Sequence, residues 1–99
     1  MVLLVNITVK PKPHGVNNMK RVLRFTADWC APCKTMATML EEINCGIPIE
    51  VIDIDKSIET SMEFGIRSVP TLVMMDGNIQ MKRMTGMKKK SDLETWLKT

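Results

Sequence analysis

The sequence predicts an α/β protein in which helices flank a central mixed β-sheet of about five strands. Segments typical of strands and helices follow one another in the order β-β-α-β-α-β-β-α, which favours a layered α/β fold. The chain has 99 residues, of which 44% are hydrophobic and 25% charged. This length and composition predict one domain, residues 1–99, with its own core, and exclude a disordered chain.

The first two predicted strands, residues 2–9 and 21–26, are rich in β-branched and aliphatic side chains. Pro11, Pro13 and Gly15 lie between them, and these residues do not support a regular helix. We therefore expect a short, irregular connection from the first strand to the second.

A helix is predicted to begin at Cys30 and to be closed by Gly46 and Pro48. Its apolar side chains recur at the spacing of one helix face, and they are Met36, Met39, Leu40 and Ile43. Residues 48–54 then alternate and are β-branched, which predicts the third strand.

Two further helices are predicted from capping signals. Ser57 is a suitable N-cap for a short helix that continues to Phe64 and ends at Gly65. Ser91 followed by Glu94 resembles a capping box for the last helix. The apolar side of that last helix consists of Leu93, Trp96 and Leu97.

A hairpin is predicted between these two helices. Residues 71–75 form a continuous apolar run, which is typical of a central strand. The segment Asp76-Gly77-Asn78 is a hairpin turn signal, and residues 79–84 follow it as a charged edge strand.

Charge and hydropathy exclude several classes of function. The net charge is only +3, and basic residues are not interleaved with aromatic ones, so we expect no nucleic-acid partner. The apolar start, residues 1–9, is too short to span a bilayer and lacks the features of a signal peptide. Three cysteines without such a signal favour a reducing compartment, so we expect a cytoplasmic location. We also expect a monomer that does not bind membranes.

The pair Cys30 and Cys33 is the strongest chemical signal in the sequence. The spacing places Cys30 at the start of a helix, where unpaired backbone N–H groups and the helix dipole favour a thiolate. Pro32 is compatible with that first turn. Cys33 lies one turn further in and is shielded by the helix. We therefore expect Cys30 to attack a substrate disulfide and Cys33 to release the product.

Two other uses of the cysteines are weaker. A structural zinc ion needs four ligands, and neither Cys45 nor His14 has a partner at a suitable spacing, so we expect no metal. A purely structural disulfide would close a very short loop in a chain without a secretion signal. Cys45 itself is compatible with a small buried apolar residue that has no chemical role.

Two motifs give the sequence its resemblance to a known family. Residues 29–34 read Trp-Cys-Ala-Pro-Cys-Lys, and residues 65–71 read Gly-Ile-Arg-Ser-Val-Pro-Thr. The first resembles the thioredoxin active-site motif and the second that family's cis-proline segment. Other matching residues are Phe25, Ala27, Asp53, Asp55, Gly77 and Gly86. The resemblance implies a trimmed thioredoxin-like fold in which the first helix is reduced or missing.

The resemblance also implies how substrates would bind. It implies a cis peptide bond between Val69 and Pro70, packed against the thiols, with the Val69 backbone open to an extended substrate segment. Lys34 would support the active site. The implied docking rim around the one exposed sulfur consists of Trp29, Ala31, Pro32, Val69, Pro70, Gly86 and Met87.

The function implied is a protein disulfide reductase that carries two electrons on the Cys30–Cys33 dithiol and has no bound cofactor. Its partners would be disulfide-containing proteins and a thioredoxin reductase or similar electron donor. One alternative is a glutaredoxin-like protein recycled by glutathione, although Trp29 and Lys34 favour thioredoxin. Another alternative is an accessory subunit of a larger enzyme, which would use the docking rim without redox turnover.

Arg24 departs most clearly from the family pattern. Thioredoxins usually have a buried aspartate here and a lysine at the place of Val51, so this chain lacks both members of that pair. A buried guanidinium is costly unless it reaches solvent or a carboxylate. Our hypothesis is that Arg24 lowers the pKa of Cys33, and the alternative is a side chain that only extends to solvent. Ala31, in place of the usual glycine, is a second departure.

Overall fold

A computed structural model of the chain describes residues 19–99. The strand predicted at 2–9, the irregular connection after it and the fate of the family's first helix therefore lie outside the described residues. Four of the expected strands lie inside this range, together with all three of the helices predicted from Cys30 onward.

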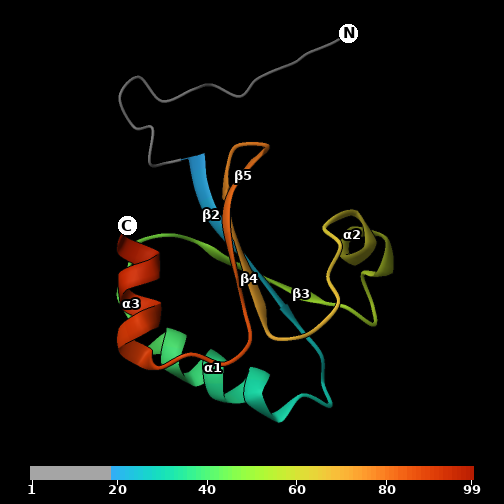
Figure 1. Ribbon diagram of the computed structural model, residues 1–99, viewed down its shortest axis with the longest axis horizontal. Coiled ribbons are helices and arrows are strands. Elements are labelled where there is room, and N and C mark those ends of the chain that lie inside the picture. Colours follow the sequence, from blue (N-terminus) through green and yellow to red (C-terminus); the bar gives the residue numbers. More distant parts are fainter. Residues whose placement is uncertain (1–18) are drawn as a thin grey trace, which may run out of the picture.

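The four described strands form one mixed sheet in the order β3-β2-β4-β5 (Figure 1). Their bounds are β2 Lys20–Thr26, β3 Ile49–Asp53, β4 Thr71–Asp76 and β5 Ile79–Thr85. Strand β2 runs parallel to β3 and antiparallel to β4, and β5 is antiparallel to β4. The prediction of a mixed sheet is thus confirmed, and its central strands are β2 and β4.

Helices cover both faces of this sheet, as Figure 1 shows. Helices α1, Ala31–Glu41, and α3, Lys90–Lys98, lie on one face, and the short α2, Ile58–Glu63, lies on the other. Because side chains alternate along a strand, β2 contributes to both cores. Beneath α1 and α3 the buried residues are Val22, Met36, Leu40, Ile43, Leu72, Met74, Leu93 and Leu97. On the opposite face they are Leu23, Phe25, Ile52, Val73 and Met75.

The hairpin between β4 and β5 turns at Gly77, as the sequence predicts. Gly77 has a φ of 64°, a left-handed conformation that favours glycine. Its N–H group donates to the carbonyl oxygen of Met19 at 3.0 Å, which joins the turn to the start of β2. Strand β5 also supports α2, because the Arg83 Nη2 group donates to the carbonyl oxygen of Phe64 at 2.6 Å.

The structure corrects several predicted helix ends. Helix α1 ends at Glu41, so Ile43 lies beyond the helix that was predicted to close at Gly46. Helix α3 begins at Lys90 with Lys89 as its N-cap, so Ser91 lies inside the helix and the predicted capping box is wrong. The Ser91 carbonyl oxygen instead accepts the hydroxyl of Thr95 at 3.1 Å. Ser57 is the N-cap of α2 as predicted, but its side chain makes no capping hydrogen bond.

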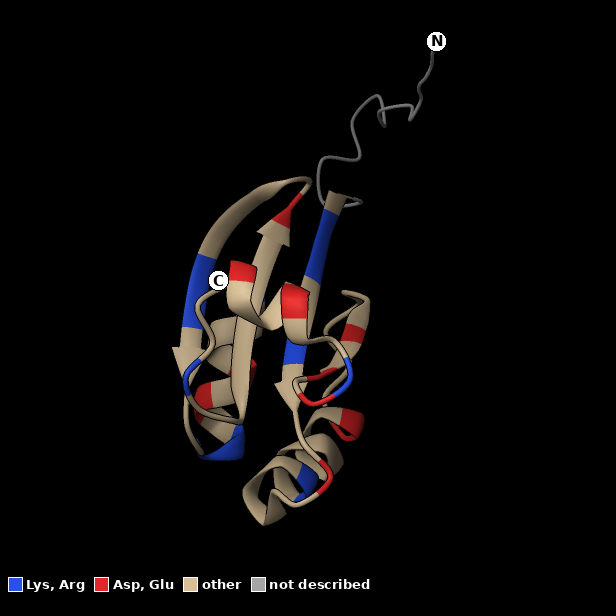
Figure 2. Cartoon of the chain, turned by 90° about the vertical axis from the view of Figure 1, so that its right-hand side faces the viewer, with Lys and Arg blue, Asp and Glu red and all other residues tan. Residues whose placement is uncertain are grey.

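Charged side chains of both signs are distributed over the described surface. Figure 2 shows basic segments on β2 and β5, with acidic segments on the helices and loops between them. Among residues 19–99, Arg21 forms an ion pair with Glu50 at 3.7 Å and Lys90 forms one with Glu42 at 3.2 Å. Within residues 19–99, no helix has the length and apolar character needed to cross a membrane.

Candidate active site

Cys30 and Cys33 are joined by a disulfide at the point where β2 leads into α1. Their Cα atoms are 5.2 Å apart, which is an ordinary separation for bridged cysteines. The two sulfurs form a small buried cluster with Ala27, and Ile54 and Val69 pack against it. The motif therefore lies at the carboxyl ends of two parallel strands, β2 and β3.

Cys30 is the N-cap residue of α1, as the sequence predicts. Its Sγ atom accepts a hydrogen bond from the backbone N–H of Cys33 at 3.1 Å. Pro32 occupies the first turn, where its missing N–H leaves no helix hydrogen bond unmade. The sequence-based expectation of a thiolate at Cys30 rests on this N–H group and on the positive end of the helix.

A cis peptide bond between Val69 and Pro70 faces the disulfide. The carbonyl oxygen of Val69 lies 3.8 Å from the Sγ atom of Cys30. Pro70 is fully buried, and its carbonyl oxygen accepts the N–H of Gly86 at 2.9 Å. Thr71 stabilises the same turn, because its hydroxyl donates to the carbonyl oxygen of Ser68 at 2.8 Å.

The docking rim differs from expectation in what it exposes. Cys33 is completely buried, but Cys30 is also only 4% exposed, so the sulfur expected to be exposed is covered in the disulfide state. Pro70 is fully buried, so it lies beneath the surface of the rim. The surface of the rim is formed by exposed Trp29, Ala31, Pro32 and Met87, with half-buried Val69 and Gly86 beside them.

Comparison with known proteins decides the family. The sequence model of the Thioredoxin family matches residues 12–99. The chain belongs to the thioredoxin family. A thioredoxin from Alicyclobacillus acidocaldarius subsp. acidocaldarius is 36% identical over 77 residues, which are 74% of this chain and 73% of the relative.

Two further proteins illustrate the family resemblance. A bifunctional thioredoxin reductase/thioredoxin from Mycobacterium leprae is 35% identical over 81 residues, which are 78% of this chain and 18% of that protein. Among solved structures, a mutant thioredoxin from Halobacterium salinarum superposes with a TM-score of 0.73 at 27% identity. The superposition covers 83% of this chain and 74% of the other. The α/β architecture is thus a thioredoxin fold. Thioredoxins use a redox-active disulfide, and the Cys30–Cys33 pair is that group here.

One contact of the thioredoxin site was not predicted from sequence. The indole Nε1 of Trp29, whose side chain is 68% exposed, donates to the Asp55 carboxylate at 2.9 Å. Asp55 in turn receives support from Asp53, whose carboxylate accepts the Asp55 backbone N–H at 2.8 Å. The signal was present, because both aspartates match the family pattern, but sequence alone does not show that they orient Trp29.

Arg24 lies on β2 next to Val51 of β3, on the face covered by α1. It borders a small cavity of about 230 Å³ together with Ala37 and Glu41 of α1. Burial lowers the pKa of the Arg24 guanidinium, and the Glu41 carboxylate opposes that shift. The sequence predicts that Arg24 reaches solvent or a carboxylate; the side chain is partly exposed, and Glu41, in the last turn of α1, lies near it.

The remaining predicted residue, Lys34, is exposed on the first turn of α1. Its backbone N–H donates to the Cys30 carbonyl oxygen at 3.3 Å, which continues the helix from its N-cap. Within the described part of the chain, no group of three or more His, Cys, Asp or Glu side chains is arranged to hold a metal ion.

Proposed function

We propose that the chain is a protein disulfide reductase that cycles Cys30 and Cys33 between dithiol and disulfide. The observation that carries this proposal is the N–H of Cys33 directed at the Sγ atom of Cys30, 3.1 Å away, at the start of α1. A donor in that place stabilises negative charge on Cys30, so Cys30 is the nucleophile.

The proposed reaction has two exchange steps. The Cys30 thiolate attacks one sulfur of a substrate disulfide, and the second substrate sulfur leaves as a thiolate that takes up a proton. Cys33 then loses its proton and attacks Cys30 Sγ, which releases the first substrate sulfur and forms the Cys30–Cys33 disulfide. Two electrons pass to the substrate, and the protein is left in the state that the structure describes.

The docking rim supports the choice of a protein substrate. Trp29 and Met87 present apolar surface that is 68% and 41% exposed, respectively. Trp29 directly precedes Cys30, and Met87 follows Gly86, whose N–H donates to the Pro70 carbonyl oxygen. We propose that the backbone of Val69, which directly precedes Pro70 and β4, pairs with an extended substrate segment. Trp29, Ala31, Pro32, Val69, Gly86 and Met87 would contact that segment, with Pro70 beneath them.

The electron donor that we propose is a thioredoxin reductase. Support comes from the Mycobacterium leprae relative, which is named as thioredoxin reductase and thioredoxin in one chain. The reductase would return two electrons to Cys30–Cys33, so the protein itself needs no bound cofactor.

The test measures insulin disulfide reduction by the full chain with either NADPH and thioredoxin reductase or glutathione and glutathione reductase. We expect turnover with the first system and a Cys30–Cys33 potential near about −270 mV, as in thioredoxin. Turnover with glutathione alone would contradict the proposed donor. A potential near about −120 mV would indicate an oxidant and would contradict the reductase itself. Cys45→Ser is the matched control, since it removes a cysteine outside the disulfide.

A further inference from the structure

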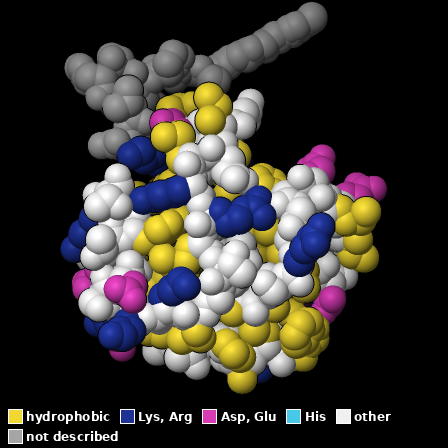
Figure 3. Space-filling view, in the orientation of Figure 1, with side chains coloured by type: hydrophobic (Ala, Val, Ile, Leu, Met, Phe, Trp, Pro, Cys, Tyr) yellow, Lys and Arg dark blue, Asp and Glu magenta, His cyan; other side chains and the backbone are white. Residues whose placement is uncertain are grey.

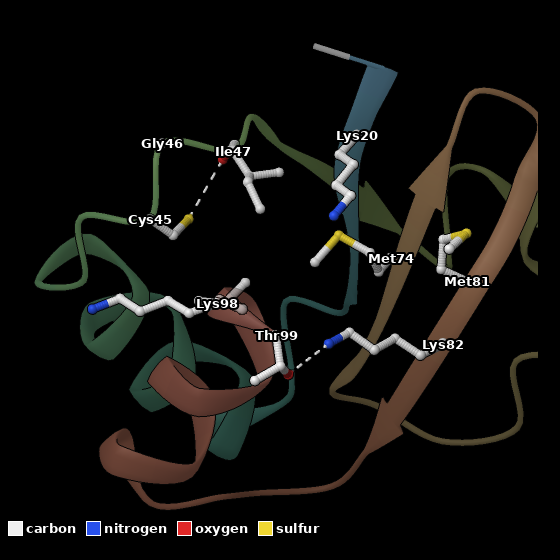
Figure 4. A pocket seen from close by; sticks show the side chains of 10 residues that line it. Lys20, Cys45, Gly46, Ile47, Met74, Met81, Lys82, Lys98 and Thr99 are labelled. Atoms are coloured by element: carbon white, nitrogen blue, oxygen red, sulfur yellow. Dashed lines mark hydrogen bonds between the residues drawn. The ribbon is translucent and has the colours of Figure 1, made fainter. Parts of the chain in front are cut away.

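A cavity of about 460 Å³ lies at the opposite end of the molecule from the disulfide. It is enclosed by the start of β2, the segment that follows α1, strand β5 and the end of α3 (Figure 4). Its apolar wall includes Ile47, Met74 and Leu97. This volume is within the range of sites for small molecules, and the redox chemistry described above makes no use of it.

Cationic groups converge on this cavity. In Figure 4 the ammonium groups of Lys20 and Lys82 point into the same space, whereas Lys98 extends away from it. Figure 3 shows the same arrangement on the surface, with basic side chains bordering an apolar hollow between α3 and β5. The residues that line the cavity include no carboxylate side chain.

Lys82 is held in place before any ligand arrives. Its ammonium donates to the Trp96 carbonyl oxygen at 2.5 Å and to the Thr99 hydroxyl at 3.2 Å. It also lies over the Trp96 ring, 4.9 Å from the centroid. An ammonium has three N–H donors, so one remains for a ligand. A cation that is already fixed loses little rotamer entropy on binding, which favours recognition.

The two lysines repel each other across the cavity. Burial lowers the pKa of Lys82, and the positive charge of Lys20 lowers it further. Both ion pairs formed by residues 19–99 involve other cations, Arg21 and Lys90, so neither pairs Lys20 or Lys82 with a carboxylate. An anion placed between the two ammonium groups would convert this repulsion into attraction.

We propose that the cavity is a binding site for a small amphipathic anion, with its acid group between Lys20 and Lys82 and its apolar part against Met74 and Leu97. A cation or metal ion does not fit, because the charged side chains that line the cavity are all lysines. A fully polar anion would leave the methionine and leucine wall without a partner. The chemistry indicated is therefore a carboxylate attached to a short hydrocarbon chain.

The cavity contains its own chemical reporter. The chain has three cysteines, and in the oxidised protein Cys30 and Cys33 are bridged, so Cys45 is the free thiol. Cys45 lines the cavity, and its Sγ atom lies 3.7 Å from the carbonyl oxygen of Ile47. A ligand in the cavity should slow the reaction of this thiol with iodoacetamide.

The experiment titrates oxidised, full-length protein carrying ¹³C-methyl methionine with octanoate, octanol or octylammonium. We expect octanoate to shift the Met74 methyl signal saturably and to slow Cys45 alkylation. Met62, which is 74% exposed on α2, should not respond. Octanol lacks the charge and should bind at least about fivefold more weakly than octanoate. Octylammonium carries the opposite charge and should not bind.

Matched variants test the role of charge. Lys20→Gln should weaken octanoate binding about fivefold, whereas Lys56→Gln, an exposed lysine on the loop before α2, should leave it unchanged. Lys82→Arg should retain binding and Lys82→Gln should lose it. Equal affinity for octanoate and octanol, equal effects of Lys20→Gln and Lys56→Gln, or an unresponsive Met74 would each overturn the proposal.

Discussion

The cysteine sulfurs that precede and follow helix α1 lie in different hydrogen-bonding environments. At its start, the Sγ atom of Cys30 accepts a backbone N–H from Cys33 at 3.1 Å. After its end, the Sγ atom of Cys45 donates toward the backbone carbonyl oxygen of Ile47 at 3.7 Å. The Val69 carbonyl oxygen also faces Cys30 Sγ at 3.8 Å, so both sulfurs have a carbonyl acceptor nearby. The difference at Cys30 is the added backbone N–H of Cys33, a donor that favours a thiolate there.

The difference also shows how one fold can separate two kinds of chemistry. The disulfide end combines a helix N-terminus, a cis peptide at Val69–Pro70 and an exposed apolar rim, all suited to exchange with another protein. The Cys45 end combines a concave apolar wall with two converging ammonium groups, which suits a small ligand. The predictions below test this contrast.

The largest effect should come from Cys33→Ser. Without the second thiol, Cys30 still attacks a substrate disulfide but no group releases the product, so disulfide turnover should be abolished. Mass spectrometry should then find substrate bound covalently to Cys30. Cys45→Ser should leave turnover unchanged, and substrate bound to Cys45 instead would reverse our assignment of the two ends.

The next effect concerns the packing of the middle of α1 against the sheet. Met36 is completely buried between the sheet and α3, so Met36→Ala should lower the free energy of unfolding by about 2–5 kcal/mol. Met62→Ala is the matched control, because Met62 is 74% exposed and should change that free energy by less than about 0.5 kcal/mol. Urea denaturation of both variants measures the difference. Similar losses would show that α1 is not anchored as described.

A kinetic comparison addresses the sulfurs directly. We expect iodoacetamide at pH 7 to alkylate Cys30 at least about tenfold faster than Cys45, since a helix N-terminus lowers a thiol pKa. Cys30 is measured in a reduced Cys33→Ser, Cys45→Ser protein, and Cys45 in the oxidised natural sequence. Equal rates would remove the electrostatic distinction between the two ends of α1.

The smallest effect concerns Arg24 of β2 and Glu41 of α1, which border the same small cavity. A cation favours the Cys33 thiolate and a carboxylate opposes it, so Arg24→Gln should raise the pKa of Cys33 and Glu41→Gln should lower it. Glu41 is eight residues from Cys33, about 12 Å along a helix, so each shift should be about half a unit or less. Titration of ¹³C-cysteine signals in reduced protein measures both. Shifts in the same direction would contradict the Coulomb explanation.

The strands could be predicted closely because their signal is local. The sequence predicts strands at residues 71–75 and 79–84, and β4 and β5 span Thr71–Asp76 and Ile79–Thr85. The alternation of polar and apolar side chains, and a continuous apolar run, can each be recognised from a few neighbouring residues in the sequence. The predicted start of α3 is wrong. Ser91 and Glu94 match a capping pattern, but the helix begins at Lys90 and no side chain makes a capping hydrogen bond.

The same distinction applies to the sites. Cys30 and Cys33 are three residues apart, so their spacing alone indicates a shared chemistry. The bond from Trp29 to Asp55 joins two loops that are 26 residues apart, and only the packing of β2 beside β3 brings them together. The cavity near Cys45 depends on Lys20 and Lys82 from different strands, so no local pattern announces it.

The positions of the two tryptophans have an optical consequence. Trp29 is hydrogen-bonded to Asp55 beside the disulfide, and Trp96 is stacked under Lys82 beside the cavity. Each end of the molecule therefore carries its own intrinsic fluorophore, and the chain contains only these two. Trp96→Phe leaves an emission signal that follows the redox state, and Trp29→Phe leaves one that follows occupancy of the cavity. The redox state of the disulfide and the occupancy of the cavity can then be followed separately by tryptophan fluorescence.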